Sequence, residues 1–216
     1  MAHLSGDASL ISALNNGEDI HTFTAKNIFN VDNDDMVLPE MRRIAKIVNF
    51  GIMYGAGPFR LSQELDIPFG EAKQIKDAYF EKYQGIEQYI ENSKLQIKET
   101  KSVETLLGRK RAVWDSDSQN KIRRDAAERM AINMPIQGTA AEMIKLAMIK
   151  IHRQINKENL KSKLIMQIHD ELLLEVHQDE IDYISKMVIE HMRDAMKLDV
   201  PIEIDFGVGP SWYEAH

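Results

Sequence analysis

The segment from Arg42 to Gly55, RRIAKIVNFGIMYG, repeats cations and then rings at intervals of four residues. In a helix, residues four apart are separated by about 40° around the axis, so they form one slowly turning stripe. The stripe consists of Arg42, Lys46, Phe50 and Tyr54. Cations pair with phosphate oxygens, and a ring one turn further on can stack on a sugar or a base. The segment therefore predicts a helix that binds a nucleotide along one face; the alternative is an amphipathic helix with two solvated cations and two core aromatics.

Two glycines, Gly51 and Gly55, directly follow the rings of this stripe. A glycine beside a stacking residue lets a ligand or a second backbone come close. Upstream, the polar stretch VDNDDMV predicts a loop, and Pro39 suits the first turn of the helix that follows. We therefore expect a helix over about 39–55 with close contacts beside its rings.

Capping residues and apolar spacing predict the other helices. Asp7 and Asp19 can each cap a first helical turn, and the second of these helices should run to about Phe29. Apolar residues recur at three- and four-residue intervals in later segments, which we expect to be helical: Phe59–Leu65, Gly70–Lys82, a longer one after Gly85 to about Lys101, Ser118 to about Asn156, and Asp179–Met196. Pro135 should break or kink the fourth of these, because proline lacks an N–H and clashes with the preceding turn.

Strands are expected in the second half of the chain. The string VETLLGRKRAV, residues 103–113, predicts a hairpin around a glycine, and a further strand is expected near Ile202–Phe206. Three cations, Arg109, Lys110 and Arg111, lie at or just past the turn of this hairpin. Such a cluster is usually solvated surface.

The string KLIMQIHDELLLEV, residues 163–176, predicts a buried hairpin. Its apolar arms, Leu164–Ile168 and Leu172–Val176, are separated by His169, Asp170 and Glu171. Two carboxylates near a low-dielectric core are costly unless a cation or hydrogen bonds compensate them. A divalent metal is the simplest compensation, and carboxylate oxygens suit Mg²⁺. The alternative is a plain exposed turn.

Arg129, Asn133 and Gln137 follow one another at four-residue intervals in the longest expected helix. Side chains of these types can hydrogen-bond the acceptors of the DNA minor groove, whose positions vary little among base pairs. This spacing favours a helix that tests the shape of a duplex without reading its sequence. A polar helix flank is the alternative.

Composition excludes several classes of protein. The chain has no cysteine, so disulfides and thiol chemistry are excluded, which fits a reducing cytoplasm. No run of 18 apolar residues and no basic-then-apolar N-terminus occur, so no membrane span or signal peptide is expected. The formal charge of −7 argues against non-specific nucleic-acid binding, but residues 106–129 are basic and residues 170–205 are strongly acidic. This distribution suits a protein that holds a polyanion at one place and metal ions or solvent at another.

The two motifs together resemble one known family. RRIAKIVNFGIMYG resembles the fingers-helix signature of the family A DNA polymerases, and QIHDE at Gln167–Glu171 resembles their palm carboxylate signature. The likeness is nearly continuous from AHLSGD to SWYEAH. It implies a mostly helical α+β fold, like that of DNA and RNA polymerases, with fingers helices and a partial palm that carries a small antiparallel sheet. The implied divisions are palm-to-fingers helices in 1–38, fingers in 39–101 with the nucleotide-binding helix at 39–55, and the C-terminal part of the palm in 102–216.

The resemblance also implies roles for individual residues and a set of ligands. Arg42, Lys46 and His21 would bind the triphosphate, Phe50 would pack on the sugar, and Tyr54 would stack at the template position. A lone histidine such as His21 in a first helical turn is more often only a surface residue. Asp170 and Glu171 would hold Mg²⁺ in a two-metal site, and Lys46 would donate a proton to the leaving pyrophosphate. The DNA-binding residues would be Arg129, Asn133, Gln137, Gln167 and His169. The partners are thus primer-template DNA and deoxynucleoside triphosphates, with no membrane.

The family's first catalytic segment, which supplies another metal-binding aspartate, has no counterpart in the sequence, nor does the thumb. We therefore expect a piece of a DNA-directed DNA polymerase, active in replication or repair as a whole. The 216 residues by themselves should lack measurable templated addition, bind Mg²⁺ weakly and self-associate through an uncovered sheet edge. Two alternatives are a non-catalytic nucleotide- or nucleic-acid-binding module of the same fold and an unrelated metal-dependent phosphohydrolase. The second is disfavoured because Asp170 and Glu171 form the one plausible metal cluster.

Overall fold

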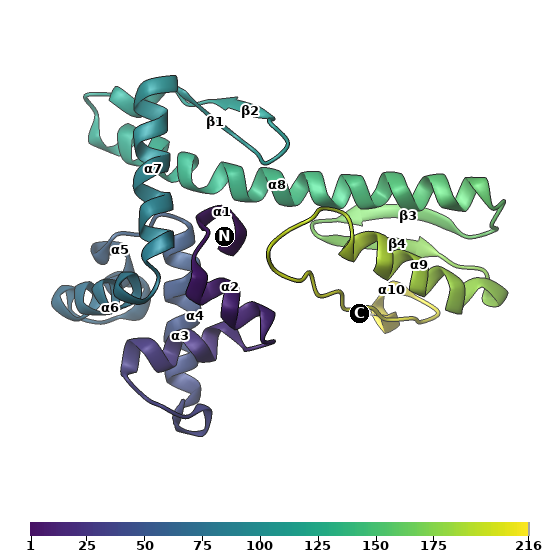
Figure 1. Ribbon diagram of the computed structural model, residues 1–216, viewed down its shortest axis with the longest axis horizontal. Coiled ribbons are helices and arrows are strands. Elements are labelled where there is room, and N and C mark those ends of the chain that lie inside the picture. Colours follow the sequence, from purple (N-terminus) through teal and green to yellow (C-terminus); the bar gives the residue numbers. More distant parts are fainter. Residues whose placement is uncertain (216) are drawn as a thin grey trace. The chain divides into compact units, whose positions relative to one another are not determined.

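The computed structural model describes residues 1–215 and divides into two compact units (Figure 1). The first unit is Met1–Gln137, and the second begins at Gly138. Helix α8 (Lys121–Lys157) begins in the first unit and ends in the second.

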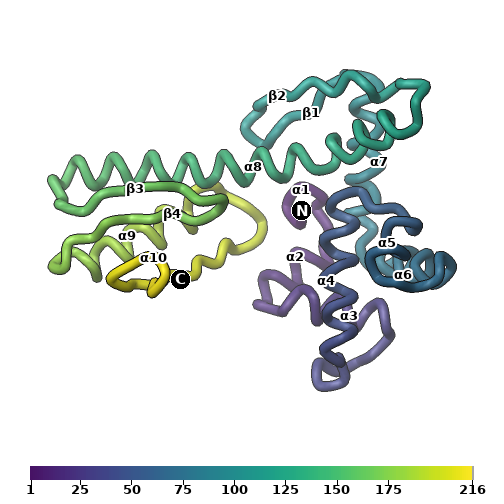
Figure 2. The backbone as a smooth tube through the Cα atoms, turned by 180° about the vertical axis from the view of Figure 1, so that it is seen from behind, coloured from purple at the N-terminus to yellow at the C-terminus, as the bar shows by residue number. Residues whose placement is uncertain are grey.

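The first unit is built mainly of helices. They are α1 (Ala2–Ser5), α2 (Ala8–Asn15), α3 (Ile20–Phe29), α4 (Pro39–Met53), α5 (Pro58–Leu65), α6 (Phe69–Lys82) and α7 (Gln84–Thr100), with short 3₁₀ turns at η1 (Asp34–Met36) and η2 (Trp114–Asp117). Asp7 caps α2, Asp19 caps α3 and Pro39 opens α4, as the sequence predicts. Helix α4 packs against α3 (Figures 1 and 2).

The cap of α2 also ties two distant parts of this unit together. The Asp7 side chain is buried, with 4% of its surface exposed. Its Oδ1 accepts from the Leu10 N–H at 2.9 Å, and its Oδ2 accepts from the Gly85 N–H, at the start of α7, at 2.9 Å. One carboxylate therefore satisfies two backbone donors, one in its own helix and one that lies 78 residues away from Asp7 in the sequence.

We expect Asp7→Ala to lower the free energy of unfolding by about 2–4 kcal/mol, because it removes a cap and leaves a buried N–H without a partner. Asp19→Ala should cost only about 1 kcal/mol, because its cap on Thr22 is exposed. Urea unfolding of the two variants checks the difference. Equal losses would mean that the contact between Asp7 and Gly85 contributes nothing.

A hairpin joins α7 to α8, as expected for residues 103–113. Strand β1 (Ser102–Glu104) pairs antiparallel with β2 (Lys110–Ala112), and Val103 lies opposite Arg111. Buried Val103 and Val113 pack with Ile97 of α7 and with Ala127 and Ala131 of α8. The side chains of 109–111 are exposed, so the cations project from a hairpin that is anchored on its other side.

Helix α8 corrects the expectation for Pro135. The helix is assigned without interruption from Lys121 to Lys157, with the proline inside it, so the expected break is wrong. Proline removes only the hydrogen bond to the Ala131 carbonyl. Pro135 is buried, and tertiary packing on both sides of it holds the helix together across that one missing bond.

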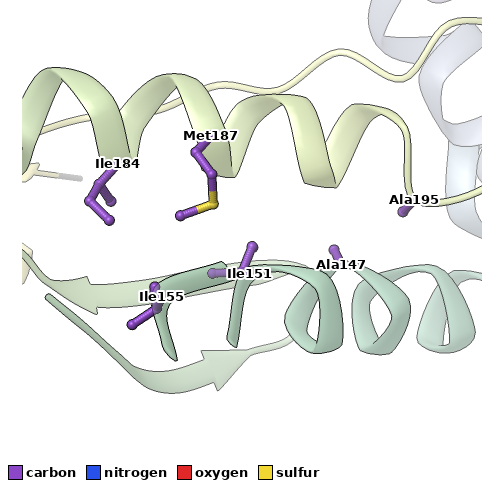
Figure 3. Packing of buried hydrophobic residues seen from close by; sticks show 6 residues of the cluster. All are labelled: Ala147, Ile151, Ile155, Ile184, Met187 and Ala195. Atoms are coloured by element: carbon purple, nitrogen blue, oxygen red, sulfur yellow. The ribbon is translucent and has the colours of Figure 1, made fainter. Parts of the chain in front are cut away.

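The second unit packs a hairpin and a helix against the C-terminal half of α8. Strands β3 (Lys163–Ile168) and β4 (Glu171–Glu175) are antiparallel, and α9 (Ile181–Arg193) follows a 3₁₀ turn, η3 (Gln178–Glu180). The core consists of Ala147, Ile151, Ile155, Ile184, Met187 and Ala195. Figure 3 shows these side chains directed toward one another from α8 and from α9 with its following residues. A short helix, α10 (Trp212–Ala215), ends the described part.

Two expectations about strands are wrong in this unit. The β3–β4 hairpin forms, but it is not buried: Ile165 is 52% exposed and Met166 47%, because only Leu172, Leu174 and Val176 of the hairpin pack against the α8–α9 core. Residues 202–206 form no strand in the described chain. Strands β3 and β4 pair with each other in a two-stranded sheet, and neither strand pairs with residues 202–206. The alternating Ile202 and Ile204 are half-buried without a ladder.

None of the described helices is long and apolar enough to cross a bilayer.

Candidate nucleotide-binding site

Helix α4 presents the stripe found in the sequence on its exposed face. Its buried face consists of Ala45, Val48, Asn49, Gly51 and Ile52. Arg42 and Lys46 are exposed, Phe50 is 43% exposed, and Tyr54, which caps the helix C-terminus, is 41% exposed. The rings are therefore not core aromatics, so the plain amphipathic alternative is wrong for them.

A hollow of about 330 Å³ lies along this face, between α4 and α5. It is lined by Arg43, Lys46, Ile47, Phe50, Gly51, Tyr54, Arg60 and Glu64. Arg60 Nε donates to Glu64 Oε1 at 2.6 Å, which neutralises the charge on the α5 side of the hollow. Arg43 Nη2 is paired with Glu40 Oε1 at 2.6 Å. Of the three lining cations, Lys46 therefore stands beside the two rings without an ion pair in the described part of the chain, in a space large enough for a small ligand.

Gly51 and Gly55 are required by packing of the protein on itself. A Cβ at Gly51 would lie 3.0 Å from Leu61 Cδ2 of α5. Gly55 has a positive φ of 69°, and a Cβ there would lie 2.9 Å from Arg129 Cγ of α8. The close approach expected beside the rings is therefore made by α5 and α8.

Arg42 is engaged by an acidic residue. Its Nε donates to Asp19 Oδ1 at 3.1 Å and its Nη2 to Asp19 Oδ2 at 2.8 Å. The Arg42 guanidinium holds the pKa of the Asp19 carboxyl well below its usual range. Asp19 is therefore charged at neutral pH. An anion that binds Arg42 has to share the guanidinium with Asp19 or displace the Asp19 carboxylate from it.

His21 of α3 lies beside this stripe. Its ring centroid is 5.8 Å from that of Phe50, and its Nδ1 is 3.1 Å from Asn49 Nδ2. Burial lowers the pKa of His21; Asp19 acts in the opposite direction, and Arg42 and Lys46 lower it further. The ring is therefore neutral near pH 7.

A buried polar cluster behind the stripe was not predicted from the sequence. Asn49 Nδ2 donates to Thr24 Oγ1 at 3.1 Å, and Thr24 Oγ1 lies 2.8 Å from the Tyr83 hydroxyl. Thr24 and Tyr83 are fully buried, and burial raises the pKa of Tyr83 to about 12. The available signal was the presence of polar residues at positions where the helical period of α3 and α4 calls for apolar ones.

The expected DNA-contacting residues of α8 lie on successive turns. Arg129 and Asn133 are half-buried, and Gln137 is exposed. Asn133 Nδ2 donates to the Arg129 carbonyl oxygen at 3.1 Å, so that side chain is turned back along its own helix. The Cα of Arg129 also lies close to Gly55, which joins this part of α8 to the end of the α4 stripe.

The remaining expected site residues lie on the β3–β4 hairpin of the second unit. Ile168 pairs with Glu171, so His169 and Asp170 form the turn, with His169 at a φ of 52°. Gln167 Nε2 donates to the His169 carbonyl oxygen at 2.8 Å. Asp170 is exposed and Glu171 half-buried, so the argument that burial of these carboxylates demands a cation is wrong.

Among the described residues, no group of three or more histidine, aspartate or glutamate side chains could hold a metal ion. Mg²⁺ in phosphoryl-transfer sites usually keeps several waters and takes only one or two carboxylates plus substrate phosphates. Asp170 and Glu171 therefore fit a magnesium ion in donor type and number, although they form no cage.

The sequence of the chain matches known proteins along its whole length. The model of DNA polymerase family A matches residues 1–214. The chain belongs to this family. Among curated relatives, this family A chain is 46% identical over 215 residues to DNA polymerase I of Bacillus subtilis and 45% identical to the thermostable DNA polymerase I of Thermus filiformis. The match covers all of the chain but only 24% and 26% of those proteins, so the chain spans about a quarter of their length.

A solved structure agrees with this assignment. The polymerase domain of Pol1 from M. smegmatis, in complex with DNA primer-template and dNTP, superimposes with a TM-score of 0.94 at 43% identity. The match covers 99% of this chain and 38% of that one. The mostly helical α+β polymerase fold expected from the sequence is thereby confirmed.

Proposed function

We propose that this chain provides the nucleotide-binding helix and the metal-binding hairpin of a DNA-directed DNA polymerase, which adds deoxynucleotides to the 3′ end of a primer. The observation that carries the proposal is the exposed face of α4, where Lys46, Phe50 and Tyr54 border one hollow. The relatives named DNA polymerase I support it, as does the related Pol1 domain that was solved with primer-template and dNTP. The proposed parts are palm-to-fingers helices in 1–38, fingers in 39–101 and palm in 102–216.

The proposed nucleotide site uses α4 from its N-terminal to its C-terminal end. Arg42, Lys46 and His21 bind the triphosphate, because they offer two cations and a ring N–H on neighbouring turns of α3 and α4. Phe50 packs on the sugar, and Tyr54 stacks at the template position. Lys46 is also placed to donate a proton to the leaving pyrophosphate, since an ammonium can bind an anion and act as its acid.

The proposed contacts to DNA come from two places. Arg129, Asn133 and Gln137 offer donors along α8 for minor-groove acceptors, and Gln167 and His169 offer further polar groups on the β3–β4 hairpin. None of these contacts distinguishes one base pair from another. Specificity would come from base pairing with the template.

Members of this family depend on divalent metal ions. We assign Mg²⁺ to Asp170, with Glu171 in support, on the strength of their donor type. Such an ion stabilises the charge that develops on phosphate oxygens during transfer. The protein's own contribution at this place is to hold Asp170 in the turn and Glu171 at the start of β4, where the pairing of Ile168 with Glu171 fixes the backbone.

A chimera tests the proposal, with this chain replacing the 215 matching residues of the Bacillus subtilis relative. We expect the chimera to extend a primer on a template in the presence of Mg²⁺ and all four dNTPs. Binding of dNTP and DNA without extension would instead favour a non-catalytic binding module of the same fold. Failure of both binding and extension by a folded chimera would contradict the proposal.

Phe50→Tyr in this chimera is expected to raise incorporation of dideoxynucleotides relative to normal ones. A phenolic hydroxyl at the proposed sugar position can supply a polar contact that a sugar without its 3′-hydroxyl lacks. Competition between ddTTP and dTTP at one template position measures the ratio. An unchanged ratio in Phe50→Tyr, with Tyr54→Phe as the control for the neighbouring ring, would show that Phe50 does not face the sugar.

A further inference from the structure

The Asn49 side chain is a buried amide between α3 and α4, directly behind the proposed nucleotide site. It is 9% exposed and immediately precedes Phe50. An amide nitrogen carries two N–H donors. Two acceptors lie 3.1 Å from Asn49 Nδ2, namely His21 Nδ1 and Thr24 Oγ1, so both donors are used.

The contact with His21 decides where the imidazole carries its proton. A donor directed at Nδ1 requires a lone pair there, and a neutral ring then carries its single proton on Nε2. A ring protonated on both nitrogens would bring two donors face to face at 3.1 Å. The charged groups nearest the ring, Asp19, Arg42 and Lys46, belong to the start of α3 and to the α4 stripe.

The amide is itself held from behind. Thr24 Oγ1 lies within 3.2 Å of both the oxygen and the nitrogen of the Asn49 side chain. Thr24 Oγ1 donates to Asn49 Oδ1 and accepts from Asn49 Nδ2, and the Tyr83 hydroxyl, which burial keeps protonated, lies 2.8 Å from the same oxygen and can donate to it. Thr24 of α3 and Tyr83 at the α6–α7 junction therefore hold the Asn49 amide in place beside His21.

We propose that Asn49 is a positioning residue, whose amide fixes His21 in the neutral form protonated at Nε2 so that the ring presents a donor to a phosphate oxygen. This inference rests on the proposed binding of a triphosphate beside His21. It adds a residue that never touches the nucleotide. Asn49 acts through the proton of His21 and through the angle at which the ring is held beside Phe50.

Nitrogen-15 NMR of the histidine-labelled 216-residue chain tests the first part of the proposal, that Asn49 fixes the protonation state of His21. The chain has seven histidines, so the His21→Gln variant assigns the signals. We expect Nε2 to show the shift of a protonated ring nitrogen and Nδ1 that of an unprotonated one. In Asn49→Asp, the carboxylate can only accept, so the proton should move to Nδ1 or both nitrogens should become protonated. Thr24→Val should weaken the preference for a proton on Nε2 of His21, and Thr24→Ser should keep it. These two variants still test the proposal if Asn49→Asp does not fold.

Titration with dATP in Mg²⁺ buffer tests the second part of the proposal, that His21 held by Asn49 donates to a phosphate oxygen. Asn49→Ser, whose side chain is too short to reach His21, should weaken binding by about tenfold, the effect of one hydrogen bond. In a His21→Ala background the same substitution should change affinity by less than about twofold, because Asn49 then has nothing to orient.

The outcomes separate this inference from the proposed function. A wild-type His21 protonated at Nδ1, or an Asn49→Ser effect of equal size in both backgrounds, overturns the inference even when dATP binds. If the wild-type chain does not bind dATP, the proposed nucleotide site fails and the phosphate-donor role of His21 falls with it. The NMR result then still decides whether Asn49 sets the tautomer.

Discussion

Lys46→Ala is expected to lower the turnover number of the chimeric polymerase by about 10²- to 10³-fold. Two effects add in this substitution: the loss of a cation that binds the triphosphate and the loss of the proposed acid for the leaving pyrophosphate, a role that contributes about 10²-fold or more. Steady-state single-nucleotide insertion measures kcat and KM separately. Lys98→Ala, which removes an exposed lysine of α7, is the matched control and should change neither constant.

Arg42 gives the comparison that separates the two effects. Its guanidinium is already paired with Asp19, so Arg42→Ala removes a partly matched charge and should mainly raise KM. Lys46→Ala should instead lower kcat. If Lys98→Ala and Lys46→Ala have similar effects, or if Lys46→Ala changes KM alone, Lys46 is not the proton donor.

The helix periodicity of α4 was sufficient to predict both its bounds and its exposed stripe. Arg42, Lys46 and Phe50 are separated by one turn each, so their common face follows from local geometry alone. The caps at Asp7 and Asp19 were predictable for the same reason, since a cap involves residues two or three apart.

The contacts that complete the candidate site join residues that are distant in the sequence. Asp19 reaches Arg42 across 23 residues, Asn49 reaches His21 across 28, and Thr24 reaches Tyr83 across 59. Nothing in local spacing identifies such partners. Only the packing of α3 against α4 and against α6 brings them together.

The errors have the same origin. Pro135 was expected on local grounds to break or kink its helix, but the helix continues through it, because packing on both sides outweighs the one lost hydrogen bond. Residues 202–206 have strand-like alternation, but a strand needs a neighbour to pair with, and in the described chain β3 and β4 pair with each other. The apolar arms of the β3–β4 hairpin predicted strands correctly, whereas their burial depended on how much surface the α8–α9 core could cover.

Asp170→Asn is expected to lower primer extension by the chimera at least about a thousandfold. The substitution preserves shape but replaces a charged oxygen ligand with a neutral amide. Metal-assisted charge stabilisation contributes several kcal/mol to phosphoryl transfer, and every 1.36 kcal/mol is about tenfold in rate. Because Asp170 is exposed in the turn, its loss should not unfold the hairpin. Asp179→Asn, which neutralises a carboxylate 86% exposed at η3 in the same unit, is the control and should retain full activity.

A metal-binding measurement identifies the cause of that loss. Mn²⁺ titrated into the isotope-labelled 216-residue chain should selectively broaden the amide signals of His169 and Glu171, and Asp170→Asn should abolish this broadening while Asp179→Asn leaves it unchanged. Broadening that persists in Asp170→Asn would place the metal on other carboxylates. If extension then also survived, Glu171 alone would have to hold the ion, and Glu171→Gln rather than Asp170→Asn should abolish activity.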